Sequence, residues 1–262
     1  MVKKILHIAD IHIRTYKRHD EYREQFDKFY EIARSEKPDR IVIAGDIVHQ
    51  KIQMTPELIK IVVEFIVECS KIAKVVILIG NHDFLANNHD RLDALTPIIN
   101  TLKLDNVEYF TKSGVHEDEN IIWIPISLYD DNQVIGFDPK NKEEGKTYIG
   151  LFHSPVTGTK TDLGFEFSDV YSQNNFAGMD WVLCGDIHKR QVLREKNPTI
   201  IMVGSLIQQN YGETISKHGF CLIDIESGNY EFKDIESEYG YYQFKITSVD
   251  DIEKGEEKLM NG

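Results

Sequence analysis

Apolar and polar residues follow one another along the first third of the chain in an order that predicts strands alternating with helices. Three apolar runs, Lys4 to Ala9, Arg40 to Ala44 and Val75 to Ile79, are short and rich in β-branched residues, as is typical of strands buried on both faces. Apolar residues from Tyr22 to Ala33 recur at helical spacing, and Thr55-Pro56 supplies an N-cap and a first-turn proline for a second helix. This order predicts right-handed crossovers and a parallel sheet.

The rest of the chain predicts a third helix and then mainly short strands. The helix is expected over residues 90–103, and Ser227-Gly228-Asn229 predicts a hairpin turn. Residues 130–146 are rich in turn formers and predict a surface loop, whereas residues 154–179 show no period and predict a long functional loop. The expected strands are Val107 to Phe110, Ile121 to Ile126, Tyr148 to Phe152, Trp181 to Cys184, Ile200 to Val203, Gly219 to Ile225, Tyr230 to Ile235 and Tyr241 to Ile246.

Polar side chains follow five of the apolar runs at the point where each run ends. Open α/β sheets bind ligands at the carboxyl ends of their strands, and buried polar groups are costly unless they bind something. Taken singly, an Asp after a strand usually caps a turn, and a His there is usually a satisfied structural or surface residue. Together these endings predict a site for divalent metals, which Asp, Asn and His bind. The endings are Asp10 and His12; Asp46 and His49; Asn81, His82 and Asp83; His153; and Asp186 and His188.

Two adjacent ions need a bridging carboxylate and several further ligands each. Asp46 is the natural bridge, because its strand is expected between the first and third strands. Asp10 and His12, with a distant histidine, can complete one ion, while Asn81, His153 and one residue of the Asp186-Ile187-His188 segment can complete the other. The remaining histidines lack this context and are expected to be structural or exposed: His7, His19, His89, His116 and His218.

Length and composition restrict the class of protein. In a chain of 262 residues we expect one domain over residues 1–236 and a C-terminal extension over residues 237–262, whose charged last stretch indicates a linker, a frayed tail or the opening of a further domain. The formal net charge of −13 argues against holding nucleic acid by overall attraction. No stretch resembles a signal peptide or a membrane span, and three widely separated cysteines predict small core residues in a reducing compartment. We therefore expect a cytoplasmic protein without a membrane partner.

The polar endings also resemble a known family. Asp-x-His, Gly-Asp-x-x-His, Gly-Asn-His-Asp, a later His and a final Gly-x-x-His, in this order between Lys4 and Gln208, resemble the calcineurin-like metallophosphoesterases. Residues 45–49, 185–190 and 204–210 look most like the SbcD-type DNA break-repair nucleases. Because members of that subfamily continue into a DNA-capping region and a partner-binding segment, the resemblance implies that residues 237–262 are the start of a capping or partner-binding region. The resemblance implies an α/β fold, a four-layer α/β/β/α sandwich of two mixed β-sheets flanked by helices. It also implies two divalent metal ions, usually manganese, with magnesium as the alternative.

The resemblance further implies a role for each polar residue. His82, oriented by Asp83, would be a non-ligand histidine that contacts the phosphate and serves the leaving group, and His49 would help position the phosphodiester. One departure is that Asp186 stands where the family usually has histidine, which leaves the identity of the second metal open. One metal would be held by Asp10, His12, Asp46 and His188, and the other by Asp46, Asn81, His153 and Asp186.

Three functions compete on this basis. The first is a DNA nuclease with exonuclease or endonuclease activity in repair or recombination, working as a homodimer with an SbcC-like ATPase; the subfamily resemblance favours it. The second is a phosphoesterase acting on a small nucleotide or a phosphoprotein, and the third is a non-catalytic binding module. Competent residues fill every ligand position, which disfavours the third. Local basic residues favour the first, although they are equally consistent with ordinary surface: Arg14, Lys17, Arg18, Lys189 and Arg190.

Overall fold

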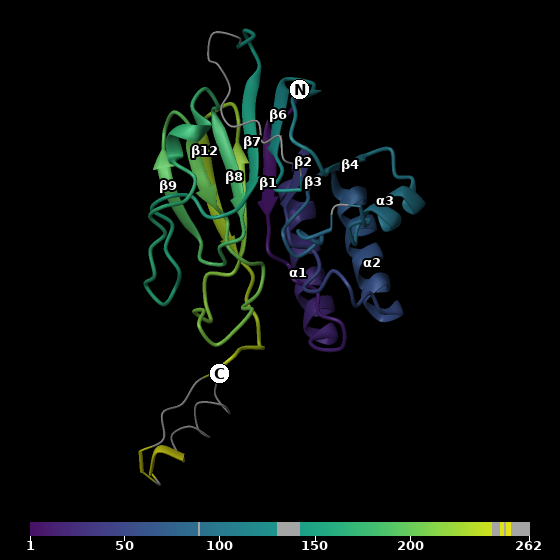
Figure 1. The fold of residues 1–262 in the computed structure, drawn as a ribbon, viewed down its shortest axis with the longest axis vertical. Helices are drawn as coiled ribbons and strands as arrows, with labels where there is room; N and C mark the ends of the chain where they lie inside the picture. The colour runs from purple at the N-terminus through teal and green to yellow at the C-terminus, as the bar shows by residue number, and fades with distance from the viewer. Residues whose placement is uncertain (89, 130–141, 243–246, 249, 253–262) are drawn as a thin grey trace.

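Two six-stranded β-sheets lie face to face in the computed structural model, which describes residues 1–88, 90–129, 142–242, 247–248 and 250–252 (Figure 1). The first sheet has the order β12-β11-β1-β2-β3-β4 and the second the order β5-β6-β7-β8-β10-β9. Each sheet has a parallel centre and at least one antiparallel edge, so both are mixed, as expected. The strands are β1 Lys4–Ile8, β2 Arg40–Ala44, β3 Lys74–Leu78, β4 Val107–Phe110, β5 His116–Asp118, β6 Ile121–Ile126, β7 Thr147–His153, β8 Trp181–Gly185, β9 Gln191–Glu195, β10 Thr199–Met202, β11 Gly219–Asp224 and β12 Asn229–Asp234.

Helices cover the outer face of the first sheet (Figure 1). They are α1 His19–Glu36, α2 Pro56–Ile72 and α3 Thr96–Leu102. The α2 helix begins as predicted, because the Thr55 side chain accepts a hydrogen bond from the Leu58 N–H and Pro56 occupies the first turn. On α1, Phe26 and Phe29 turn inward against Phe65 of α2, so the helical periodicity correctly located the buried face.

Side-chain alternation divides the apolar residues between two cores. On β2, Ile41 and Ile43 point to the helices, whereas Val42 and Ala44 point into the space between the sheets. This arrangement explains the unbroken apolar run, since both faces of the strand are buried. Each fully buried aliphatic side chain contributes about 1.5–3 kcal/mol. Two well-filled cores therefore fix the strand ends that carry the polar residues.

The layer outside the second sheet is built differently from the helical layer. Phe176 and Met179 of the 154–179 segment pack on Ile124 and its neighbours, and in the described part of the chain this layer has a single 3-10 turn, η2 Gln173–Phe176, in place of α-helices. The α/β sandwich of two mixed β-sheets is confirmed, with α-helices on the outer face of the first sheet. The irregular character predicted for residues 154–179 is confirmed too, with two isolated bridges, Val156 to Tyr171 and Lys160 to Glu166, inside the segment.

Several local predictions were wrong. The third helix begins at Thr96, because the Asp93 carboxylate accepts the N–H groups of Leu95 and Thr96, each at 2.8 Å, and so caps a later start. Strands β5 and β9 were missed, since each is short and half polar. The strand expected from Tyr241 onward is not formed at residues 241–242, and its remainder lies outside the described residues, as do residues 130–141 of the predicted surface loop.

The domain boundary after residue 236 stays a prediction.

All three cysteines are buried and unpaired, as expected of core residues. Within the described ranges, we find no helix that is both long enough and apolar enough to traverse a lipid bilayer.

Candidate metal centre

The carboxyl ends of strands from both sheets meet at one edge of the sandwich and bring the predicted ligands together. Ligand atoms of Asp10, His12 and His188 lie within 4.8 Å of one another, and so do those of Asp10, Asp46 and His153. These residues follow or end β1, β2, β7 and β8. Strand β2 lies between β1 and β3, as expected for the strand that carries the bridging carboxylate.

Asp46 occupies the middle of this group. Its Oδ2 atom lies 3.5 Å from Nε2 of His12 and 3.2 Å from Nε2 of His153. Nε2 of His12 lies in turn 3.0 Å from Nε2 of His188. One carboxylate oxygen thus faces a histidine of each predicted ligand set, which is the position that a bridge between two ions requires.

Asp186 lies with the second ligand set. Its Oδ1 atom accepts a hydrogen bond from Nδ2 of Asn81 at 3.2 Å and lies 4.0 Å from Nε2 of His153. Its main-chain N–H donates to Oδ1 of Asp10 at 2.9 Å. The Asp186 carboxylate therefore faces the other candidate ligands and does more than cap the turn that precedes His188. Its role as a ligand stays a prediction.

The backbone around these residues adopts a costly conformation. Asp10, His12, Asp46 and Asp186 have φ angles of 52°, 50°, 56° and 80°, in the left-handed region that residues with a Cβ rarely adopt. Such residues persist where the surrounding structure holds them, and they gather at functional sites. Gly80 permits the close approach of β3, because a Cβ there would lie 2.2 Å from Oδ1 of Asp46.

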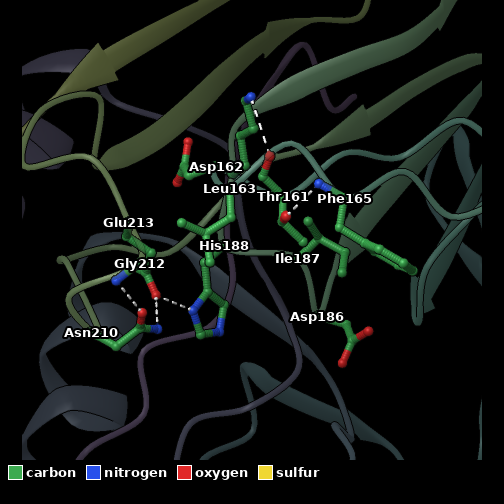
Figure 2. Close-up of a pocket in the computed structure, with 11 residues that line it drawn as sticks. Thr161, Asp162, Leu163, Phe165, Asp186, Ile187, His188, Asn210, Gly212 and Glu213 are labelled. Atoms are coloured by element: carbon green, nitrogen blue, oxygen red, sulfur yellow. Dashed lines mark hydrogen bonds and ion pairs between the residues drawn. The ribbon is translucent and has the colours of Figure 1, made fainter.

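Hydrogen bonds fix the orientation of the two distant histidines. Nδ1 of His153 lies 2.6 Å from the carbonyl oxygen of Ala44, and Nδ1 of His188 lies 2.7 Å from Oε1 of Glu213 (Figure 2). Because a carbonyl or carboxylate oxygen only accepts, each ring carries its proton on Nδ1 and presents Nε2 to the centre. Such support is typical of metal-binding histidines.

Sequence reasoning missed Glu213. It lies three residues beyond the noted run of residues 204–210, and its side chain is buried between His188 and the main chain. Its second oxygen accepts the N–H of Gln209 at 2.7 Å. The available signal was a lone acidic residue directly after Gly212, which is too common a pattern to single out.

The expectation that Asp83 orients His82 was wrong. The buried Asp83 carboxylate accepts the main-chain N–H groups of Gly80, Asp46 and Val48 at 2.9–3.2 Å, so it braces the loops after β2 and β3. Nδ1 of His82 lies instead 2.8 Å from the carbonyl oxygen of His49. The main chain of His82 donates to Oδ1 of Asp46 at 2.8 Å, and a ring nitrogen of His82 lies within 4.8 Å of potential ligand atoms of His12 and His49, so its role beside the metals as a non-ligand stays a prediction.

The electrostatics of the centre suit cations. Burial raises the pKa of Asp10 to about 7. Burial also acts to raise the pKa of Asp46, but the charges of the neighbouring histidines, His153 above all, outweigh it and hold that pKa below its usual range. Oδ2 of Asp10 and Oδ1 of Asn81 are buried without a hydrogen-bond partner among the described residues. Crowded carboxylates and orphaned oxygens of this kind fit divalent metal ions, whose binding would supply the missing partners.

Residues 3–190, more than half of the chain, match the family profile described as calcineurin-like phosphoesterase. The chain belongs to this family. The phosphoesterase is 40% identical to the uncharacterized protein R555 of Acanthamoeba polyphaga mimivirus over 96% of its own length and 19% of that protein. It is 28% identical to the uncharacterized metallophosphoesterase YhaO of Bacillus subtilis, with 74% of this chain and 48% of that protein covered. It thus spans about a fifth and about half of these two relatives.

A nuclease component is also among the relatives of this phosphoesterase. The SbcD component of the nuclease SbcCD from Staphylococcus epidermidis is 24% identical, with 95% of this chain and 80% of that protein covered. Among solved structures, a dimetal phosphatase from Danio rerio covers 85% of this chain and 92% of its own at 12% identity and a TM-score of 0.49. The phosphoesterase YfcE from E. coli covers 85% and 88% at 16% identity and a TM-score of 0.42.

Proposed function

We propose that this phosphoesterase is a metal-dependent DNA nuclease that hydrolyses phosphodiester bonds at a dinuclear centre. The observation that carries the proposal is the position of Asp46: one oxygen faces His12 and His153, and the other holds the main chain of His82. Two ions bound here would lower the pKa of a bound water and neutralise charge on the phosphate. His82 would lie next to the two ions, and its side chain would not coordinate either of them.

The residues of the chain itself divide the work. Asp46 and the predicted ligands around it would hold the ions. Asp83 fixes the loops after β2 and β3, because its carboxylate accepts the N–H groups of Asp46 and Gly80. Nδ1 of His82 is bonded to the carbonyl oxygen of His49, so Nε2 is the atom able to exchange a proton with the substrate. His82 is thus suited to protonate the oxygen that leaves.

Cations near the centre support an anionic polymer as substrate, although fewer are available than the sequence suggested. Arg18 is paired with Glu21 at 2.6 Å, and Arg190 is paired with Asp234, so neither is free to bind phosphate. Lys51, which sequence reasoning did not single out, donates to the carbonyl oxygen of Asn81 at 2.8 Å and brings a positive charge to the second ligand set.

The metal and the partners belong to the same proposal. A second site with Asp46 and Asp186 is oxygen-rich, which favours manganese or magnesium over zinc. The likeness to the SbcD component of SbcCD supports a role in DNA repair or recombination, with an SbcC-like ATPase as partner and a homodimer of the nuclease chain. An acidic chain that holds duplex weakly needs a partner of this kind to grip DNA.

A cavity beside the centre supports a second candidate function. It has a volume of about 410 Å³, includes Asp186 and His188 in its wall, and is flanked by the exposed side chains of Leu163 and Phe165 (Figure 2). Its size and mixed lining suit one nucleotide. A phosphodiesterase acting on a small nucleotide is therefore the alternative.

One experiment separates these functions. The protein is incubated in the presence of manganese with each of three substrates in separate reactions: linear duplex DNA, single-stranded DNA and bis-p-nitrophenyl phosphate. The His82→Asn variant is the control. Cleavage of DNA by the wild type and its loss in the variant are expected. Cleavage of the small diester without cleavage of either DNA would favour the small-nucleotide function, and no cleavage of any substrate would contradict both.

A further inference from the structure

Arg14 connects two loops of the centre that are distant in sequence. It lies in the loop after β1, where its NH1 group is 3.1 Å from Nε2 of His49 and its NH2 group donates to the carbonyl oxygen of Gln209 at 3.1 Å. A guanidinium only donates hydrogen bonds, so Nε2 of His49 is the acceptor, and the proton of that ring is on Nδ1. Nε of Arg14 is buried without a hydrogen-bond partner among the described residues. The two terminal nitrogens of the guanidinium are thus the ones that protein groups hold.

This contact continues to His82. The carbonyl oxygen of His49 accepts from Nδ1 of His82 at 2.8 Å, and the two rings are stacked with centroids 5.5 Å apart and planes 22° from parallel. Arg14 fixes the His49 side chain, and the main chain of the same residue fixes the His82 ring. The order of contacts is therefore Arg14, His49, His82.

The other anchor of Arg14 is rigid. Gln209 is buried, its N–H donates to Glu213 at 2.7 Å, and its side chain donates to the carbonyl oxygen of Ile11 at 3.1 Å. Glu213 also holds His188. Arg14 therefore braces His49 against the same residues that hold a candidate metal ligand.

We propose that Arg14 is a positioning residue that acts through His49 to aim His82 at the leaving oxygen of the substrate. The inference rests on the proposed phosphodiesterase function and on His82 as the proton donor in it. It also changes the role of His49: its Nε2 is occupied by Arg14, so the residue supports His82 and does not donate to the phosphate through that atom.

The kinetic test uses the leaving group. A nucleoside alkoxide needs protonation to leave, whereas p-nitrophenolate is stable without it. Removal of a proton donor should therefore slow DNA cleavage far more than cleavage of bis-p-nitrophenyl phosphate. In Arg14→Met, kcat on DNA should fall roughly 10- to 100-fold, and kcat on the small diester by less than about 3-fold. Arg14→Lys should recover part of the loss, and Arg23→Met, which changes a half-exposed arginine on α1, should behave as wild type.

A double-mutant cycle separates positioning from substrate binding. Adding Arg14→Met to His82→Asn should cause no further loss on DNA, because residues that act as one unit are not additive. Equal losses on both substrates, or additive losses in the double variant, would overturn the inference. A wild type that cleaves neither substrate would contradict the proposed function instead.

A second readout requires no metal and no turnover. Nitrogen-15 spectra of the imidazoles in the metal-free protein should show His49 protonated at Nδ1 with Nε2 accepting a hydrogen bond. The Nε2 resonance of His49 and the Nδ1 resonance of His82 should both move in Arg14→Met and stay in place in Arg23→Met. Unchanged resonances in Arg14→Met would show that the contact does not exist in solution and would overturn the inference.

Discussion

Nδ1 of His188 lies 2.7 Å from a carboxylate oxygen of Glu213, and this contact turns Nε2 of the imidazole toward His12 and Asp10. Glu213→Ala should leave the ring free to rotate and should weaken metal binding about 10- to 100-fold, the range found when such supporting groups are removed. Calorimetric titration of the metal-free variant with manganese measures the change. Glu238→Ala, which alters an exposed acid, is the matched control and should titrate as the wild type does. Equal manganese affinity in Glu213→Ala and the control would show that the contact does not support a ligand.

His82→Asn should remove the proton donor and keep the metals. DNA cleavage should fall by roughly 10²- to 10⁴-fold, the usual contribution of a positioned acid. Metal content, measured by atomic absorption after desalting, should equal that of the wild type, because His82 meets Asp46 through its main chain only. A variant that lost a metal ion would identify His82 as a ligand.

Asp186 tests the second ion. Asp186→Ala should remove one metal and most of the activity, since its carboxylate lies with Asn81 and His153. Asp186→His should retain two metals and shift the preference toward zinc, because imidazole suits zinc better than a carboxylate does. The measurement is metal stoichiometry together with activity in manganese, magnesium and zinc. Full activity and unchanged metal content in the alanine variant would rule out ligation.

Much of the fold and of the ligand set could be predicted because strand ends are local features. The apolar run that ends at Ala44 indicated a buried strand and placed Asp46 just beyond its carboxyl end. The strand order confirmed that this strand, β2, lies between β1 and β3. The partners of Asp83 and His82 could not be predicted, because they depend on how the loops after β2 and β3 fold over each other. The helix at Thr96 was misplaced for a related reason: only the structure shows Asp93 capping it.

Acid should destabilise the protein through His7. This side chain lies on β1 beside Val42 and Cys221 in the core between the sheets, and neither of its ring nitrogens has a hydrogen-bond partner among the described residues. Burial lowers its pKa to about 3. The unfolded chain, with a histidine pKa near 6.5, therefore binds one proton more between these values. The contribution of His7 to the free energy of unfolding should be largest above about pH 6.5 and fall toward pH 3, with a limiting slope of about 1.4 kcal/mol per pH unit.

The check is urea denaturation across that pH range. His7→Leu should remove this part of the slope and keep or raise stability at pH 8, because it also removes two unpaired polar atoms. His116→Leu, which changes a partly exposed histidine, should leave the slope as in the wild type. An identical acid limb in His7→Leu and wild type would contradict the assignment.

DNA binding by the isolated chain should be weak and should depend steeply on salt. The net charge of −13 opposes binding, and two of the expected cations are engaged in ion pairs. Few phosphates are then neutralised, and those few contacts weaken as counterion concentration rises. Fluorescence anisotropy with a labelled duplex, without added metal and at increasing sodium chloride, measures both properties. Tight binding that survives several hundred millimolar salt would contradict the expectation.

The hydrogen bond from Asp186 to Asp10 joins positions 176 residues apart. During synthesis, β1, β2 and β3 leave the ribosome long before β8 does. At that stage the first ligand set lacks His188 and the second lacks His153 and Asp186. Both predicted ligand sets are therefore complete only after β8 has been synthesised and the two sheets have come together.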